Sequence, residues 1–452
     1  MSDASLRTAA WYGDRPLNLS FPNDWRVTTL RPDTPAPLPD AAIVEALERP
    51  IGHPPIRELA RGKSRPVVIV DDLTRPTPAG RVVPFVLRQL GDAGISSNAV
   101  TIMMATGAHG PASRDAIEKK VGPEAARQCR LLAHDHTRNL VKVGRTSYGT
   151  PVIVNREVRD GDFLVGIGGI YPQHSTGFGG GSKLALGVLG TRSISALHYR
   201  HPSMHGSYEI ENDFRSVLDE VARLIGLETT ISVQLDCNRA PVRLASGDHT
   251  LYYRDEVNFA KQAYRAPPPG TADLVISNAY PIDVSLTFMR SKGIIPLLYT
   301  GSGASRIMIS ACPEGVGHHA LFPFMNLPRF ARQSHVARVA RNTPGVLPRK
   351  IIGRVARRIS PQHEHQDGSD ADVERRNPIW LFPPGREAGS LPAEIPGMNA
   401  IFSWEEALEK VVEEQGRRSK LEVIIYPCAP LHVIDVPAAM GARLSGEVAA
   451  LE

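Results

Sequence analysis

Polar residues that could do chemistry follow the first clear apolar run of this 452-residue sequence, at 66–70. The segment Asp71-Asp72-Leu73-Thr74-Arg75-Pro76 combines two carboxylates, a hydroxyl and a guanidinium on a turn stiffened by proline. An arginine in that position could hold a substrate carboxylate through two parallel hydrogen bonds. The structural alternative is a helix N-cap with a local ion pair between aspartate and arginine.

A second cluster carries a histidine between two glycines. His109 lies between Gly107 and Gly110, shortly after an apolar run at 99–104. A histidine on such a loop can approach a ligand, and its pKa near neutrality suits general acid/base work. An ordinary histidine on a surface turn is the alternative.

The third cluster, from Gly168 to Lys183, is rich in glycine and ends in three consecutive glycines, a serine and a lysine. Backbone N–H groups exposed by such a run can hold a phosphate, with the lysine close by. The order differs from the P-loop, because Ser182 separates the last glycine from Lys183, and it is not GxGxxG either. A glycine-rich structural turn is the alternative.

The fourth cluster consists of His198, His201 and His205. A zinc site built from these three histidines is one alternative, although the HxxHxxxH spacing lacks the glutamate of the HExxH motif. Solvated histidines at a helix end are the other alternative. The pair His318-His319 is a weaker signal of the same kind.

The overall composition is that of an ordinary globular protein, with 42% apolar and 22% charged residues, which excludes disorder as the general state. No apolar run reaches 18 residues, and the N-terminus has no apolar signal region, so we expect neither a membrane span nor secretion. The four cysteines are far apart and form no CxxC motif, which fits a protein of the reducing cytoplasm.

The positive charge of this chain is local. Nine basic residues and no acidic residue lie between Arg329 and Arg358, and they exceed the net charge of +5, so the rest of the chain is acidic. Only Phe330 is an aromatic residue in that segment, which makes base stacking and nucleic-acid binding an unfavoured hypothesis. A non-enzymatic binder of an anionic partner or nucleic acid, with affinity that falls steeply with salt, stays open as an alternative.

The elements that must position these clusters alternate between strand-like and helix-like runs. Strands are predicted at 66–71, 99–104, 163–167, 230–235, 272–277, 306–310 and 421–426. Helices are predicted at 82–90, 112–121, 124–128, 214–225, 286–291 and 404–415. This alternation predicts an α/β fold with mostly parallel sheets, in which ligands bind beyond the carboxyl ends of the strands.

The run of three prolines at 267–269 predicts a linker. We therefore expect two α/β domains, 1–268 with the cofactor and catalytic histidines and 269–452 with a basic insertion at about 326–377, and an active-site cleft between them.

The order of the clusters is more specific than any one of them. Across residues 60–315, the Asp-Asp-x-Thr-Arg-Pro segment, the glycine-flanked histidine, the glycine-rich segment ending in lysine and the following histidine resemble the nickel-pincer-nucleotide-dependent lactate racemase family. The resemblance implies an isomerase, a racemase or epimerase that inverts a 2-hydroxy acid by reversible hydride transfer. Its cofactor would be a pyridinium mononucleotide whose two thio-acyl arms bind nickel together with a ring carbon. Cofactor-maturation proteins would be its partners.

The resemblance also implies roles for individual residues. Lys183 would bond covalently to one thio-acyl arm, and His198 would complete the nickel coordination. His109 and His174 would act as acid and base, because inverting a carbinol carbon needs one base for the hydroxyl group of each enantiomer. Arg75 would anchor the substrate, and the other residues near cofactor and phosphate would be Asp72, Gly180, Gly181 and Ser182.

The second half of the chain would contribute Lys292, reaching the substrate across the cleft. Phe288 and Met289 stand where lactate-specific members have a tyrosine–glutamine pair, so a polar substrate contact is replaced by an apolar wall. The sequence therefore does not assign lactate itself as the substrate. A zinc-dependent hydrolase or racemase that uses the histidine cluster is the enzymatic alternative; nickel with a visible absorption band, or zinc without one, separates the two.

Overall fold

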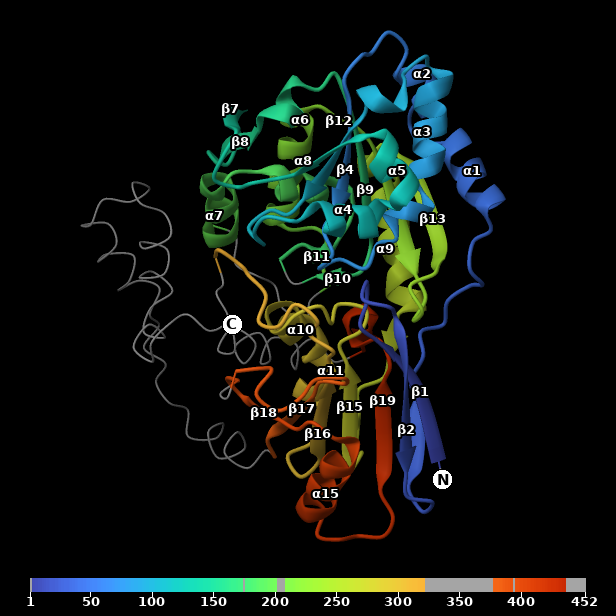
Figure 1. Ribbon diagram of the computed structural model, residues 1–452, viewed down its shortest axis with the longest axis vertical. Helices are drawn as coiled ribbons and strands as arrows, with labels where there is room; N and C mark the ends of the chain where they lie inside the picture. Colours follow the sequence, from blue (N-terminus) through green and yellow to red (C-terminus); the bar gives the residue numbers. More distant parts are fainter. Residues whose placement is uncertain (1, 174, 201–207, 322–376, 393–394, 436–452) are drawn as a thin grey trace, which may run out of the picture.

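The computed structural model describes residues 2–173, 175–200, 208–321, 377–392 and 395–435. Within them the chain forms two six-stranded sheets, one above the other in Figure 1. The basic segment 329–358 lies outside the described residues, as does most of the insertion predicted at 326–377. Among the described residues, no helix has the length and apolar character needed to cross a membrane.

The first sheet has the strand order β13-β12-β9-β4-β5-β6, and only the pair β12 and β13 is antiparallel. Its strands are β4 (Pro66–Asp71), β5 (Thr101–Ala105), β6 (Arg130–Ala133), β9 (Phe163–Gly169), β12 (Leu227–Leu235) and β13 (Pro241–Gly247). Every residue of β4 is buried, which is expected for a β-branched run in the middle of a sheet that is covered on both faces.

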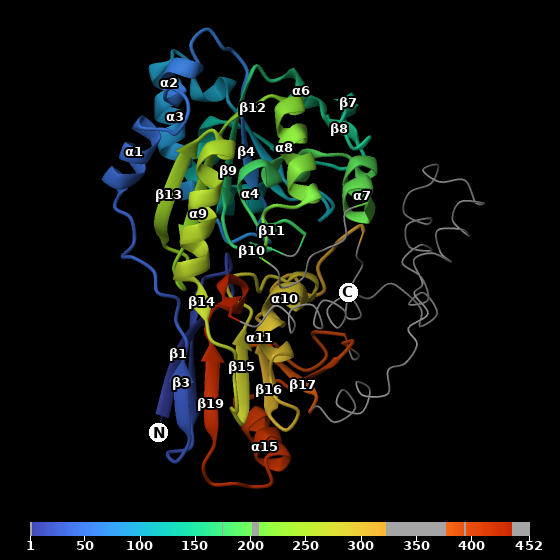
Figure 2. The same cartoon turned by 180° about the vertical axis from the view of Figure 1, so that it is seen from behind.

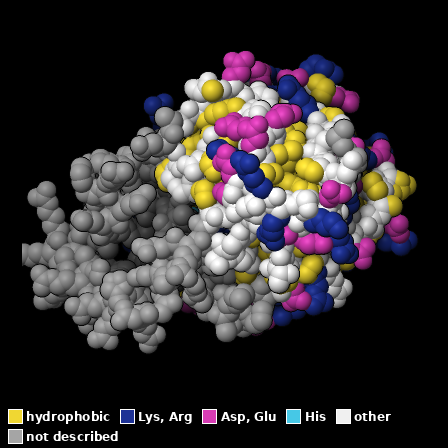
Figure 3. Space-filling view, turned by 90° about the horizontal axis from the view of Figure 1, so that it is seen from below, with side chains coloured by type: hydrophobic (Ala, Val, Ile, Leu, Met, Phe, Trp, Pro, Cys, Tyr) yellow, Lys and Arg dark blue, Asp and Glu magenta, His cyan; other side chains and the backbone are white. Residues whose placement is uncertain are grey.

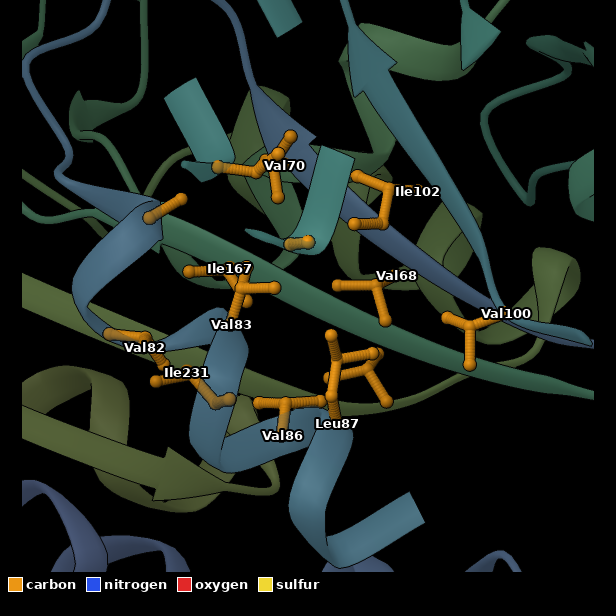
Figure 4. Packing of buried hydrophobic residues seen from close by; sticks show 14 of the residues in the cluster. Val68, Val70, Val82, Val83, Val86, Leu87, Val100, Ile102, Ile167 and Ile231 are labelled. Atoms are coloured by element: carbon orange, nitrogen blue, oxygen red, sulfur yellow. The ribbon is translucent and has the colours of Figure 1, made fainter. Parts of the chain in front are cut away.

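The two faces of this sheet follow the alternation of side chains along β4. Val68 and Val70 pack with α3 (Val83–Asp92), as Figure 4 shows, and with α1 (Asp40–Glu48). Val67 and Ile69 belong to the core on the other face, with α7 (Thr191–Arg200), α8 (Asp213–Ile225) and the 3₁₀-helix η3 (Gly181–Val188). The sheet is therefore a middle layer, and its polar residues are left for the strand ends.

The second sheet is parallel throughout, in the order β18-β17-β16-β15-β19-β3. Its strands are β3 (Arg26–Thr29), β15 (Leu274–Asn278), β16 (Ser305–Ile309), β17 (Ile379–Phe382), β18 (Met398–Ala400) and β19 (Glu422–Tyr426). Helices α10 (Leu286–Gly293) and α11 (Ile295–Leu298) contribute to the core on one face. The core on the other face includes α15 (Trp404–Glu414) and the hairpin of β1 (Ser2–Thr8) and β2 (Arg15–Phe21).

The predicted α/β architecture with mostly parallel sheets is thus confirmed. Strand β3 comes from the N-terminal part of the chain and pairs with β19 in the second sheet, as Figure 2 shows. The domain bounds 1–268 and 269–452 stay a prediction. The remaining described elements are α2 (Ile56–Leu59), η1 (Ala79–Arg81), η2 (Ser97–Ala99), α4 (Arg114–Val121), α5 (Pro123–Gln128), β7 (Leu140–Arg145), β8 (Pro151–Asn155), α6 (Arg156–Asp160), β10 (Pro172–Gln173), β11 (Gly177–Phe178), α9 (His249–Ala263), β14 (Arg265–Ala266), η5 (Ala429–Leu431) and β20 (Val433–Ile434).

The turn between β1 and β2 forms hydrogen bonds with residues next to both sheets. The backbone N–H groups of Ala9 and Ala10 donate to the buried carboxylate of Asp283, at 2.7 and 3.0 Å. On the same turn, Asp14 accepts from Arg239 next to the first sheet, at 2.6 Å, and from the hydroxyl of Tyr280, at 2.7 Å. These contacts fix the loops after β15 relative to the ends of the first sheet.

The described part of the surface seen from below, where the second sheet ends, carries positively and negatively charged side chains side by side. Figure 3 shows Lys and Arg side chains interspersed with Asp and Glu side chains over its described part. The described part of this face therefore has no region of one charge sign that would steer a charged partner.

Candidate active site

The loops that follow β4 and β5 bring Asp72 and His109 into contact. The Nδ1 atom of His109 lies 2.6 Å from Oδ2 of Asp72, and the other carboxylate oxygen accepts from the hydroxyl and the backbone N–H of Thr74, at 2.5 and 3.1 Å. Parallel neighbouring strands end at the same edge of the sheet, so residues 37 positions apart in sequence become partners.

The protonation of this pair follows from burial and from its neighbours. Burial acts to raise the pKa of Asp72, but His109, Arg75 and the hydrogen bond from Thr74 outweigh it and lower this pKa to about 2. Burial lowers the pKa of His109, and the charges of Arg75 and Lys183 add to the effect, while Asp72 opposes it. At neutral pH we therefore assign a carboxylate and a neutral imidazole, with the proton on Nδ1 and the lone pair of Nε2 as the basic position.

A buried lysine fixes the loop that carries Asp72. The ammonium group of Lys120 is 2.5 Å from Oδ1 of Asp71 and donates to the backbone carbonyls of Asp72 and Arg75, at 3.0 and 2.9 Å. Burial lowers the pKa of Lys120 and raises that of Asp71, and each partner acts against that shift. The lysine was missed by sequence reasoning, because a single lysine on a polar-faced helix gives no signal of burial.

Replacing Lys120 with methionine should lower the free energy of unfolding by about 3–5 kcal/mol, because the carboxylate of Asp71 would stay buried without its cation. Urea unfolding measures the loss. Lys119→Met, on the exposed side of the same helix, should cost no more than about 1 kcal/mol. Equal effects of both variants would contradict the structural role of Lys120.

The guanidinium of Arg75 lies close enough to the Asp72–His109 pair to affect its pKa values. Its Nη1 atom donates to the hydroxyl and carbonyl oxygens of Thr74, at 3.2 and 3.3 Å, and the side chain is half-buried. The guanidinium is among the charges that lower the pKa values of His109 and Lys183. It is therefore a cation that could bind a substrate carboxylate at this site.

The glycine-rich segment reaches the site from β11. Gly180 and Gly181 have φ angles of 76° and 55°, a conformation that favours glycine. A Cβ atom on Gly180 would lie 2.7 Å from the side chain of Ile170, so only a glycine fits there. After these residues the chain forms η3, which contains the buried Ser182 and the half-buried Lys183.

Three cations act electrostatically on the amine of Lys183. Burial lowers the pKa of its amine well below the ordinary value, and the charges of Arg75, Lys292 and Arg215 lower it further, against the opposing effect of Asp72. A lowered pKa makes the amine easier to deprotonate, and the deprotonated nitrogen has the lone pair that a nucleophile needs.

His198 lies on α7 with its ring held from two sides. Its Nδ1 is 2.9 Å from the carbonyl of Ile194, and its ring centroid is 5.2 Å from that of Phe214. A proton on Nδ1 places the lone pair on Nε2, the arrangement that metal-binding histidines adopt. His174, His201 and His205 lie outside the described residues, and the described part of the chain contains no group of three His, Cys, Asp or Glu side chains that could hold a metal ion.

The second half of the chain covers this site with α10 and the loop after β16. The ring of Phe288 is 4.6 Å from that of His109, and His319 is 5.1 Å from His109 on another side. Lys292 is buried and close enough to lower the pKa of Lys183. Met289, by contrast, is fully buried in the core of the second sheet and is not brought to the site.

The structure therefore gathers many of the predicted residues and adds one. Asp72, Arg75, His109, Lys183 and Lys292 influence one another, and His198 acts on the added residue, His319, whose pKa is lowered well below its usual value by burial and by the other two histidines and Arg75. Sequence reasoning had only the weak His318-His319 pair as a signal, because its loop reaches the site through tertiary contacts such as the 2.8 Å bond from Ala320 N to Ala108 O.

Comparison with known proteins shows that this chain is similar to one protein family. Residues 12–209 match the family model described as the lactate racemase N-terminal domain. The chain is 26% identical over 394 residues to a lactate racemase of Lactiplantibacillus plantarum, covering 84% of this chain and 88% of the relative. It is 25% identical over 334 residues to that of Thermoanaerobacterium thermosaccharolyticum, covering 71% and 77%.

Solved structures show the same fold. The lactate racemase apoprotein of Thermoanaerobacterium thermosaccharolyticum superposes with a TM-score of 0.68 at 20% identity, over 96% of this chain and all of the other. A Thermotoga maritima protein solved by a structural genomics consortium gives a TM-score of 0.59 at 16% identity, over 90% of this chain and all of the other. At these identities the likeness concerns the fold alone.

Proposed function

Since the chain belongs to the lactate racemase family, we propose that it is an isomerase that racemises or epimerises a 2-hydroxy acid with a nickel-pincer nucleotide attached at Lys183. The observation that carries the proposal is that Lys183, at the end of the glycine-rich segment, has a lowered pKa and acts electrostatically on His109 of the Asp72–His109 pair. Lys120 also has its pKa lowered by burial, but its ammonium group pairs with the carboxylate of Asp71, whereas the charges next to Lys183 are mostly cations that lower its pKa further.

The described residues fit such a cofactor. The amine of Lys183 would form the covalent bond, and the Nε2 atom of His198 would bind nickel, because its Nδ1 is held by the carbonyl of Ile194. The φ angles of 76° and 55° at Gly180 and Gly181 form a turn whose backbone N–H groups could bind a nucleotide phosphate. When bound, the cofactor supplies an electron-poor acceptor for the hydrogen of the carbinol carbon.

The chain's own part in the reaction is to hold the substrate and move its hydroxyl proton. We assign the base to Nε2 of His109, and Asp72 stabilises the imidazolium that forms when the proton arrives. Arg75 and Lys292 are assigned to hold the carboxylate while the carbon inverts, because both cations are close enough to Lys183 to lower its pKa. His174 is assigned as the second base, for the opposite enantiomer; its side chain lies outside the described residues.

The proposal is tested with protein coexpressed with cofactor-maturation proteins. Enantiopure 2-hydroxy acids, including lactate, larger apolar acids, dicarboxylates and sugar acids, are incubated in deuterium oxide, and optical rotation and deuterium at the carbinol carbon are followed. We expect nickel in the protein and loss of rotation without deuterium uptake, because a hydride returns from the same acceptor. Zinc in place of nickel, with deuterium uptake, would support the metal-dependent alternative instead.

The wall formed by Phe288 should matter for the substrate. Phe288→Ala removes the ring that packs 4.6 Å from His109, so we expect kcat/KM to fall by about 10-fold or more. The matched control is Met289→Leu, which changes the adjacent residue inside the second core and should leave kcat/KM within about 2-fold. A larger effect of the control would remove Phe288 from the substrate site.

A further inference from the structure

Two side chains hold the glycine-rich segment from behind, on the side of α8 and α9. Arg215 donates from Nη1 to the carbonyl of Gly180, at 3.0 Å, and from Nη2 to the carbonyl of Phe178, at 2.5 Å. The hydroxyl of Tyr253 donates to the carbonyls of Phe178 and Gly179, at 3.0 and 2.9 Å. Three consecutive carbonyls are therefore occupied by two buried side chains.

The two side chains also hold each other. The guanidinium of Arg215 lies 4.2 Å from the ring centroid of Tyr253 and donates to its hydroxyl, and its Nη1 is 3.3 Å from the hydroxyl of Ser182. Planar stacking and a forked donor are features that arginine has and lysine lacks. The arrangement therefore depends on arginine itself rather than on any cation.

The location of Arg215 is unfavourable for a positively charged side chain. The side chain is 6% exposed, and within the described residues it forms no ion pair with a carboxylate. It also lies in the first turn of α8, where the helix dipole disfavours a cation. Burying a cation costs folding free energy, so we infer that Arg215 has a role beyond packing.

Lys183 supplies that reason, because it directly follows Ser182, whose hydroxyl contacts Arg215. The backbone N–H of Lys183 donates to the carbonyl of Gly180, which Arg215 also contacts. Four charged groups act on the amine: Arg75, Lys292 and Arg215 lower its pKa, and Asp72 raises it. Arg75 and Lys292 are assigned to the substrate, whereas Arg215 binds the backbone of the glycine-rich segment.

A cavity borders the segment at Ser182, next to the two side chains. It has a volume of about 370 Å³ and is lined by Ser182, Arg215, His249 and Tyr253 among others. Without the bonds to its carbonyls, the segment could shift toward this space and carry Lys183 away from the site.

We propose that Arg215 and Tyr253 are positioning residues that hold the backbone of residues 178–182 and set the reactivity of Lys183. The inference deepens the proposed function, on which the cofactor part of it rests. Its first test needs no cofactor, so the two can fail separately.

The first test measures the amine of Lys183 in the full, cofactor-free chain. Acetic anhydride is applied in pulses between pH 6 and 11, and acetylation of Lys183 and of the exposed Lys420 is quantified by peptide mass spectrometry. In the wild type, Lys183 should titrate below Lys420. Arg215→Gln should raise the midpoint of Lys183 by about one pH unit, because a nearby like charge is lost. Arg215→Lys and Tyr253→Phe keep the charge and should leave the midpoint close to that of the wild type.

The matched control is Arg223→Gln, which removes an equal charge from the exposed last turn of the same helix. It should leave the midpoint of Lys183 unchanged. Equal midpoints in Arg215→Gln and Arg223→Gln would overturn the assignment.

The second test follows cofactor attachment after coexpression with maturation proteins, by intact-protein mass. Arg215→Lys and Tyr253→Phe should each lower the fraction of protein with the mass increment at least several-fold, although both keep the charge. Wild-type loading in both variants would overturn the positioning role, and this holds even if Arg215→Gln does not fold. If wild-type protein itself carries no increment while the midpoints shift as expected, the proposed function fails and the effect of Arg215 on Lys183 stands.

Discussion

Replacing Lys183 with alanine is expected to abolish the covalent cofactor adduct and to reduce racemisation to background. The amine is the only nitrogen nucleophile that we assign to the attachment, and its pKa is lowered well below the ordinary value by burial and by the cations Arg75, Lys292 and Arg215. Losing covalent attachment removes both the anchor of the cofactor and its orientation, which together supply several orders of magnitude in rate.

Intact-protein mass spectrometry after coexpression with maturation proteins measures this result. Wild-type protein should carry a mass increment that Lys183→Ala lacks, and Lys142→Ala, at an exposed lysine, should keep it. Lys183→Arg keeps a long nitrogen-bearing side chain but should also lack the increment, because a guanidinium stays protonated and is a poor nucleophile. An increment retained in Lys183→Ala would contradict the attachment site, and wild-type racemisation without any increment would contradict the covalent cofactor.

The strand-end clusters could be predicted from sequence because their signals are local. The run at 66–71 is β-branched and continuous, so a buried strand and the polar loop after it follow directly from residue types. The helix predicted at 214–225 is likewise confirmed as α8, and its apolar residues are buried, with one exception. Leu224 is 42% exposed, because its neighbour on β7 is Gly144, which has no side chain to cover it.

The long-range partners could not be predicted. Strand β3 has only four residues with a half-exposed pattern, and its place beside β19 depends on a partner almost 400 positions later in the chain. The same holds for Asp71 with Lys120 and for Gly180 with Arg215, since a buried cation looks like a surface cation in sequence. Sequence patterns thus find the loops that carry the chemistry, whereas the groups that set their pKa values come from the fold.

The Asp72–His109 pair leads to the second large effect. Asp72→Asn should lower kcat by about 10²–10⁴-fold, because the amide no longer fixes the Nδ1 proton or stabilises the imidazolium. His109→Ala should lose at least as much, since the assigned base itself is gone, while cofactor loading at Lys183 is retained. Asp40→Asn, an exposed carboxylate on α1 that pairs with Arg81, is the matched control and should keep wild-type kcat.

The pH profile distinguishes this role from a merely structural one. His109 acts as a base only when neutral, so kcat/KM falls as the pH drops through its pKa, which lies below 6.5 in the wild type. Asp72 raises that pKa, because its negative charge favours the imidazolium. Removing the charge must therefore move the acid limb of kcat/KM to lower pH, even as the plateau falls. An acid limb that moves to higher pH, or stays in place while activity drops, would show that Asp72 does not act through the imidazole of His109.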